Sequence, residues 1–169
     1  MNTGQMMMTL AAMALLSSLL VTIQRGFSTS GSVLLKSKAG IEAISLTNSV
    51  IQEASGKFFD ASTATAADTN VSQLTAVASL GGNSGESASK DMNTFNDFDD
   101  FSGFSYKILT ALPDSFTVSC KVVYVDPSNL NVASTVRTWH KKLTVTVTNP
   151  ALGTDTIKTD YVMSYWYFR

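Results

Sequence analysis

The sequence predicts an α+β fold in which a long N-terminal helix packs on a four-stranded antiparallel sheet. Residues 6–23 form an uncharged apolar run that leads into a stretch with helical spacing of its large apolar residues. In residues 104–169, apolar and polar residues alternate in four segments, as in strands with one buried face. A length of 169 residues suits one domain plus a long terminal helix.

The apolar run begins almost at the start of the chain, and the first charged residue is Arg25. A helix over residues 6–23 covers about 27 Å, close to the roughly 30 Å of a bilayer core. We therefore expect residues 5–25 to form an apolar transmembrane or assembly helix. A removed secretory signal and a plain membrane anchor are the alternatives. The start lacks the basic residues of a secretory signal, and the positive residues after the run conflict with export of an anchored domain.

A second helical stretch, amphipathic in pattern, is expected over residues 32–59. Gly26 and Gly31 bracket a segment of poor helix propensity, so we expect a melted or kinked segment before it. An apolar stripe with intervals of seven and three residues predicts the face that presses on the sheet. Its members are Leu34, Ile41, Ile44, Ile51 and Phe58.

Residues 60–103 are expected to form a variable loop region, rich at first in Ala, Ser, Thr and Gly. Asn70 is placed to cap a short helix, and Asn70-Val71-Ser72 matches a glycosylation sequon. The segment GGNSGESASK is predicted to form a flexible loop. In DMNTFNDFDDFSGF a phenylalanine recurs every three residues, which predicts rings that pin the loop on the sheet.

The same acidic stretch contains candidate calcium ligands at Asp97, Asp99 and Asp100. Calcium takes about 6–8 oxygen ligands, which dense carboxylates can supply, but the spacing does not match an EF-hand loop. A solvated loop edge is the simpler interpretation. The main expectation is therefore that the protein holds no cofactor.

Four segments predict the strands, and Asp126-Pro127 and Asn149-Pro150 mark turns between them. The cleanest alternation, from Phe116 to Tyr124, places Cys120 inside. Trp139, Leu143, Val145 and Val147 are expected to face the core, whereas His140, Lys142, Thr144 and Thr146 face outward. The last segment ends in an aromatic cluster, which is either a subunit contact or part of a covered central strand. Its members are Tyr161, Tyr165, Trp166, Tyr167 and Phe168.

No pattern in the chain points to catalysis or to nucleic acid. His140 is the only histidine, and no Ser, Cys or carboxylate pattern places a triad around it. The single cysteine excludes an intramolecular disulfide, and Cys120 is expected to be a small core residue. A net charge of −1 offers no basic surface for nucleic acid. The sequence therefore predicts a protein that is not an enzyme.

The start of the chain, Met-Asn-Thr-Gly followed by Gln5 and the apolar run, resembles the class III signal of type IV pilin-like proteins. The resemblance implies a leader of residues 1–4 that a peptidase removes between Gly4 and Gln5. Thr9 stands where the family usually has a Glu, which is thought to neutralise a neighbouring N-terminal ammonium. We hypothesise that cyclisation of Gln5 to pyroglutamate removes this positive charge instead. The C-terminal hairpin, from KKLTVTV to YVMSYW, also looks like that of minor pilins and pseudopilins.

The resemblance implies a structural subunit of an extracellular type IV pilus-like filament at the bacterial cell surface, with a membrane-inserted precursor. Its expected partners are further copies of the chain in a helical homopolymer, the cytoplasmic membrane before assembly, and the pilus assembly machinery. Two other functions stay open: a pseudopilin-like component of a secretion machine, and a membrane-anchored binding domain that never assembles. Helix-to-helix contacts are predicted at Leu10, Leu15, Leu16, Leu19 and Leu20.

Overall fold

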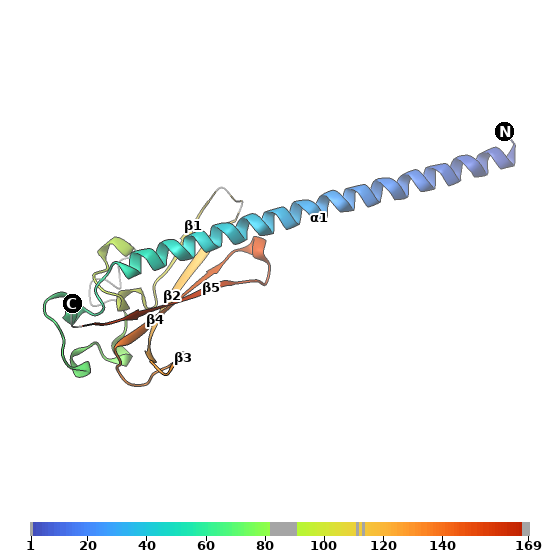
Figure 1. Ribbon diagram of the computed structural model, residues 1–169. Helices are drawn as coiled ribbons and strands as arrows, with labels where there is room; N and C mark the ends of the chain where they lie inside the picture. The colour runs from blue at the N-terminus through green and yellow to red at the C-terminus, as the bar shows by residue number, and fades with distance from the viewer. Residues whose placement is uncertain (1, 82–90, 111, 113, 167–169) are drawn as a thin grey trace. The chain divides into compact units, whose positions relative to one another are not determined.

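The computed structural model describes residues 2–81, 91–110, 112 and 114–166. One long helix, α1, is followed by short 3-10 turns and then by a five-stranded antiparallel sheet (Figure 1). The α+β class is confirmed, with five strands rather than four. The elements are α1 (Thr3–Ser55), β1 (Ser105–Ile108), β2 (Phe116–Asp126), β3 (Asn129–Ala133), β4 (His140–Thr148) and β5 (Ile157–Ser164).

The sheet has the order β1-β2-β4-β5, and the additional strand β3 pairs with β2. All of these pairs are antiparallel, with Cys120 opposite Val145 and Leu143 opposite Tyr161. Along β2 and β4 buried residues alternate with less buried ones, as the sequence pattern predicted. Cys120 lies in the buried set, so its predicted inward position is confirmed.

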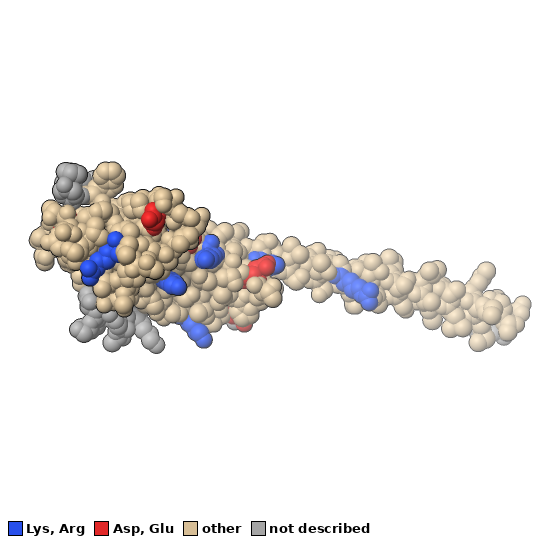
Figure 2. Space-filling view, turned by 90° about the horizontal axis from the view of Figure 1, so that it is seen from below, with Lys and Arg blue, Asp and Glu red and all other residues tan. Residues whose placement is uncertain are grey.

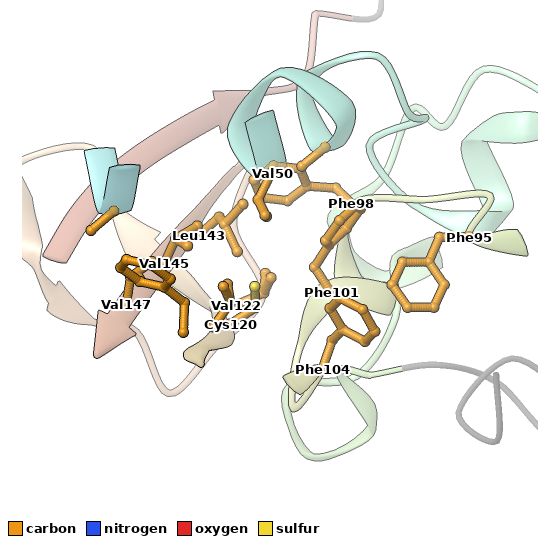
Figure 3. Packing of buried hydrophobic residues seen from close by; sticks show 14 of the residues in the cluster. Val50, Phe95, Phe98, Phe101, Phe104, Cys120, Val122, Leu143, Val145 and Val147 are labelled. Carbon is orange, nitrogen blue, oxygen red and sulfur yellow. The ribbon is translucent and has the colours of Figure 1, made fainter. Parts of the chain in front are cut away.

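The chain divides into two compact units, residues 1–38 and residues 39–169. In the second unit, α1 packs on the sheet through mostly small side chains, all of them fully buried: Ala39, Ala43, Thr47, Val50 and Ala54. Their spacing of four, four, three and four residues places them on one face of the helix. Figure 3 shows Val50 above Leu143 and beside Phe98 in this contact.

The apolar stripe predicted to press on the sheet is therefore wrong for most of its members. Leu34, Ile41, Ile44 and Phe58 are 68%, 71%, 51% and 54% exposed, and only Ile51 contacts the core. Small side chains let the helix backbone approach the sheet closely, while large rings from the loop fill the remaining volume. A stripe chosen by size and hydrophobicity thus selected a different face of the helix.

The predicted kink between Gly26 and Gly31 is also wrong, because α1 is helical throughout. Thr29 Oγ1 donates to Arg25 O at 2.9 Å, and Ser32 Oγ donates to Thr29 O at 2.8 Å. A glycine costs only about 1 kcal/mol within a helix, whereas a break sacrifices several backbone hydrogen bonds. The helix ends at Ser55, just before Gly56, rather than at residue 59.

The phenylalanine repeat builds the second half of the core. Phe95, Phe98, Phe101 and Phe104 are at most 8% exposed and contact β2 and β4 residues such as Val122 and Leu143 (Figure 3). The Phe95 and Phe101 rings meet edge to face, with centroids 5.0 Å apart. The expectation that these rings pin the loop on the sheet is confirmed. Their burial also carries the intervening aspartates into the interior.

Two smaller expectations have mixed outcomes. Asn70 does cap a turn, since its side chain accepts from Ser72 N, but the turn is a 3-10 helix of only three residues, Val71–Gln73. The loop GGNSGESASK lies outside the described residues from residue 82 to residue 90.

The predicted aromatic cluster at the C-terminus has two kinds of member. Tyr165 stacks on Trp139 inside the domain, whereas Trp166 is 73% exposed. Tyr167 and Phe168 lie outside the described residues.

Candidate functional site

The N-terminal part of α1 presents large apolar side chains on all sides. Each of the five leucines predicted to make helix contacts is 53–71% exposed. Within α1, the most apolar 18-residue stretch has none of its residues buried, and by length and composition the helix can cross a membrane. On the face seen in Figure 2, the described N-terminal part of the helix is tan, without blue or red.

Three hydroxyl groups on this apolar helix form hydrogen bonds within the helix. A polar group without a partner is costly in an apolar medium, and back-bonding to a carbonyl one turn earlier removes that cost. Thr9 is among them. The bonds run from Thr9 Oγ1 to Met6 O at 2.9 Å, from Ser18 Oγ to Leu15 O at 2.8 Å, and from Thr22 Oγ1 to Ser18 O at 2.9 Å.

The predicted processing residues lie at the start of α1. Gly4 and Gln5 are exposed in its first turn, and Gln5 N donates to Asn2 O at 2.9 Å. Cleavage between them, and cyclisation of Gln5, stay predictions.

A buried ion cluster lies in the second unit, centred on Lys141 of β4. The Lys141 side chain is fully buried, and its Nζ lies 2.5 Å from Asp99 Oδ1 and 2.8 Å from Asp60 Oδ2. A third hydrogen bond, 2.8 Å long, runs to Phe59 O. Nζ also lies 4.6 Å from the Phe59 ring centroid and 5.4 Å from that of Tyr124. The ammonium is therefore bound by three oxygens and lies beside two aromatic rings.

Asp60 is held as a carboxylate by many donors. Its Oδ1 accepts from the Ser62 and Thr75 hydroxyls at 3.0 Å, and its Oδ2 accepts from Thr75 N at 2.9 Å. Burial by itself raises the Asp60 pKa, but the Lys141 charge and these hydrogen bonds outweigh it, so the pKa is lowered. Asp60 thus stays ionised beside the lysine.

The three candidate calcium ligands are all buried, at most 3% exposed, so the solvated loop edge is wrong. Asp97 Oδ1 accepts from the backbone N–H groups of Asp99 and Asp100, and Asp100 Oδ2 accepts from Asn96 N and Asp97 N. Two further oxygens, Asp97 Oδ2 and Asp100 Oδ1, are buried and accept no hydrogen bond from the part of the chain that the structure describes. Among the described residues, no group of three or more His, Cys, Asp or Glu side chains is arranged to hold a metal ion. Calcium binding stays a prediction.

Burial, together with the charges of neighbouring carboxyl groups, raises two pKa values in this cluster. Burial, followed by the charges of Asp99 and Asp100, raises the pKa of Asp97 to about 8. Burial also raises the pKa of Asp99, although the nearby Lys141 charge opposes the shift. The shift in the Asp97 pKa favours the protonated form of Asp97 at neutral pH.

Sequence reasoning missed Lys141 and Asp60 as members of a site. Strand alternation did contain the signal, because position 141 is in phase with the inward residues Leu143, Val145 and Val147. A lysine in an inward position of a strand needs a buried partner. Asp60 lies 81 residues away in the chain, and no local pattern identifies it.

The remaining candidates are structural contacts. Cys120 is buried, which raises the pKa of its thiol to about 12, so it is not a thiolate at neutral pH. His140 is half-buried, and its Nδ1 lies 2.7 Å from Ser164 Oγ, its directly opposite neighbour on β5. A shallow pocket of about 460 Å³ lies between Val77 and Arg137, but the Arg137 guanidinium already donates to Ser72 O and Thr75 O.

The observations define a chain with a membrane-compatible apolar helix whose second half packs on an antiparallel sheet. No protein-family model, no curated protein and no solved structure matches this chain.

Proposed function

We propose that this chain is a structural subunit of a type IV pilus-like filament, assembled by bundling of the N-terminal apolar helices. The observation that carries the proposal is the exposed apolar surface of α1, on the same helix that packs on the sheet further along the chain. A helix that is apolar all round must be covered by lipid or by other protein. The proposal assigns lipid as the cover of the precursor and copies of the helix as the cover of the assembled subunit.

The energetics favour a polymer whose core stays dry. Full burial of one leucine side chain is worth roughly 1.5–3 kcal/mol relative to water. Five such leucines therefore make release of the helix into water prohibitive. Transfer from lipid into a helix bundle lacks this driving force, because lipid tails are as apolar as leucine. Assembly machinery would supply the work of extraction, and close packing would hold the bundle together.

A second exposed apolar set supports assembly over a simple anchor. Ile41 and Ile44 belong to the folded domain, yet they are 71% and 51% exposed on α1. In an anchored domain that never assembles, these two large apolar side chains would stay in contact with water. In a filament, neighbouring subunits would cover them.

Electron microscopy of material sheared from cells that express the full chain tests the proposal. We expect filaments that a chain-specific antibody labels in wild type and in Leu16→Met, which keeps the side chain apolar and of similar size. Leu16→Arg, which adds a charge at an exposed position of the apolar helix, should abolish them. Recovery of wild type only from the membrane would favour the anchored domain. Recovery in short periplasmic structures would favour the secretion component, and either result would overturn the filament.

A further inference from the structure

The ion cluster around Lys141 brings a primary amine and a carboxyl group into contact away from water. Lys141 Nζ is fully buried and lies 2.5 Å from Asp99 Oδ1. Several carboxyl groups share this one cation, and burying an excess of charge is costly. A reaction that removes charges from the cluster would relieve that cost.

The two carboxyl groups that touch the lysine differ in their surroundings. Asp60 accepts hydrogen bonds from Ser62 and Thr75, which keep it ionised, and its Oδ2 lies 2.8 Å from Lys141 Nζ, within reach of the proton that the amine must give up. Among the described residues, Asp99 has no comparable set of donors on its side chain, which accepts from Lys141 Nζ. Its pKa is raised, so its neutral acid form, which is the form open to attack by an amine, is easier to reach.

A third carboxyl group, Asp97, is positioned as a proton donor. Its Oδ1 is fixed by the backbone N–H groups of Asp99 and Asp100, while its Oδ2 is buried and accepts no hydrogen bond. A protonated Asp97 needs such an oxygen free to carry its hydrogen. The Asp99 carboxyl group is close enough to Asp97 for its charge to raise the Asp97 pKa.

We propose that Lys141 Nζ and Asp99 Cγ join in an intramolecular amide bond, which cross-links β4 to the 3-10 turn Asp99–Phe101, with Asp60 as proton acceptor and Asp97 as proton donor. This inference is independent of filament assembly.

The reaction balances without an external reactant. The Lys141 ammonium gives one proton to Asp60, and Asp97 gives its proton to the Asp99 carboxyl group. The free amine pair on Nζ attacks Cγ and forms the C–N bond. The nitrogen returns a proton to Asp97, and one Asp99 oxygen takes the proton from Asp60 and leaves as water. Asp60 and Asp97 return to their starting forms, and the amide N–H then donates to Asp60.

Two features of the site favour the reaction. Contact between the two groups in a fixed geometry replaces a bimolecular encounter, which is worth a large effective concentration. Aromatic walls from Phe59 and Tyr124 exclude the water that would hydrolyse the amide.

Mass spectrometry of the folded full chain tests the proposal. Wild type should be lighter by one water molecule than its sequence mass, after correction for N-terminal processing. Trypsin should fail to cleave after Lys141, and a branched product should join the peptides of residues 91–107 and 138–142. A folded wild type with the full mass would overturn the cross-link. A branch to the peptide of residues 58–90, which contains Asp60, would overturn the assignment to Asp99.

Two variants separate the chemistry from other water losses. Lys141→Arg keeps a cation but has no amine able to form this amide, so its chain should show the full mass. A persistent loss of water in this variant would place the reaction elsewhere. Asp97→Asn keeps the shape but has no acidic proton, and cross-linking should slow about 100-fold, as expected when a general acid is removed. An unchanged rate would overturn the role of Asp97.

Discussion

Substitutions on two adjacent residues of α1 distinguish the helix face that the structure buries from the face that sequence pattern favours. Ala43 is fully buried against the sheet, whereas its neighbour Ile44 is 51% exposed. If the structure is right, Ala43→Leu should destabilise the domain and Ile44→Ala should not. If the sequence stripe were right, Ile44→Ala would remove a core side chain and Ala43→Leu would add a harmless surface leucine.

The expected magnitudes are well separated. Ala43→Leu forces extra carbon atoms into a close-packed contact, which typically costs about 1–3 kcal/mol of the free energy of unfolding. Ile44→Ala at an exposed position should change it by less than about 0.5 kcal/mol. Val50→Ala, at a fully buried position of the same face, should cost about 2 kcal/mol through lost burial and a small cavity.

Urea unfolding of the full chain in detergent micelles provides the measurement. Near-ultraviolet circular dichroism suits it, because the signal reports the Trp139–Tyr165 stack in the domain rather than the long helix. A larger loss for Ile44→Ala than for Ala43→Leu would refute the burial of the small-residue face. Equal and negligible losses for Ala43→Leu and Val50→Ala would refute the close contact itself.

Three further predictions concern single buried groups. Burial raises the pKa of Asp97 to about 8. The contribution of Asp97 to the stability of the folded state is therefore complete below about pH 4 and is lost as the pH rises towards 8. Asp97→Asn should flatten this part of the curve of unfolding temperature against pH. The buried Cys120, with its raised pKa, should resist iodoacetamide in the folded chain at pH 8 and react after unfolding; rapid labelling of the folded protein would contradict its burial. Tyr124→Phe removes the hydroxyl that donates to Thr75 O at 2.8 Å and should cost about 1 kcal/mol in urea unfolding, whereas no loss would mean that this bond contributes nothing.

Local patterns in the sequence predicted the elements of the fold well. The alternation around Cys120 and Val145 predicted two paired strands with the right faces buried, because strand periodicity is a property of neighbouring residues. The phenylalanine repeat similarly predicted a loop pinned on the sheet. The helix face failed, because which face packs depends on how closely the sheet approaches, and small residues at Ala39 and Ala43 carry little hydrophobic signal.

In the ion cluster, too, local pattern found the residues but did not predict their environment. The sequence marked the acidic stretch as a candidate site but interpreted it as solvated, whereas the fold buries it beside Lys141, 42 residues away from Asp99 in the chain.

By itself, then, the sequence determined an uncharged apolar helix long enough to cross a membrane, and an antiparallel sheet domain after it. Both follow from composition and from short-range periodicity along the chain. Only the tertiary structure decided which helix face is buried and which carboxyl groups surround the lysine. Those outcomes depend on contacts between residues far apart in the chain, which close-packing selects and no local pattern encodes.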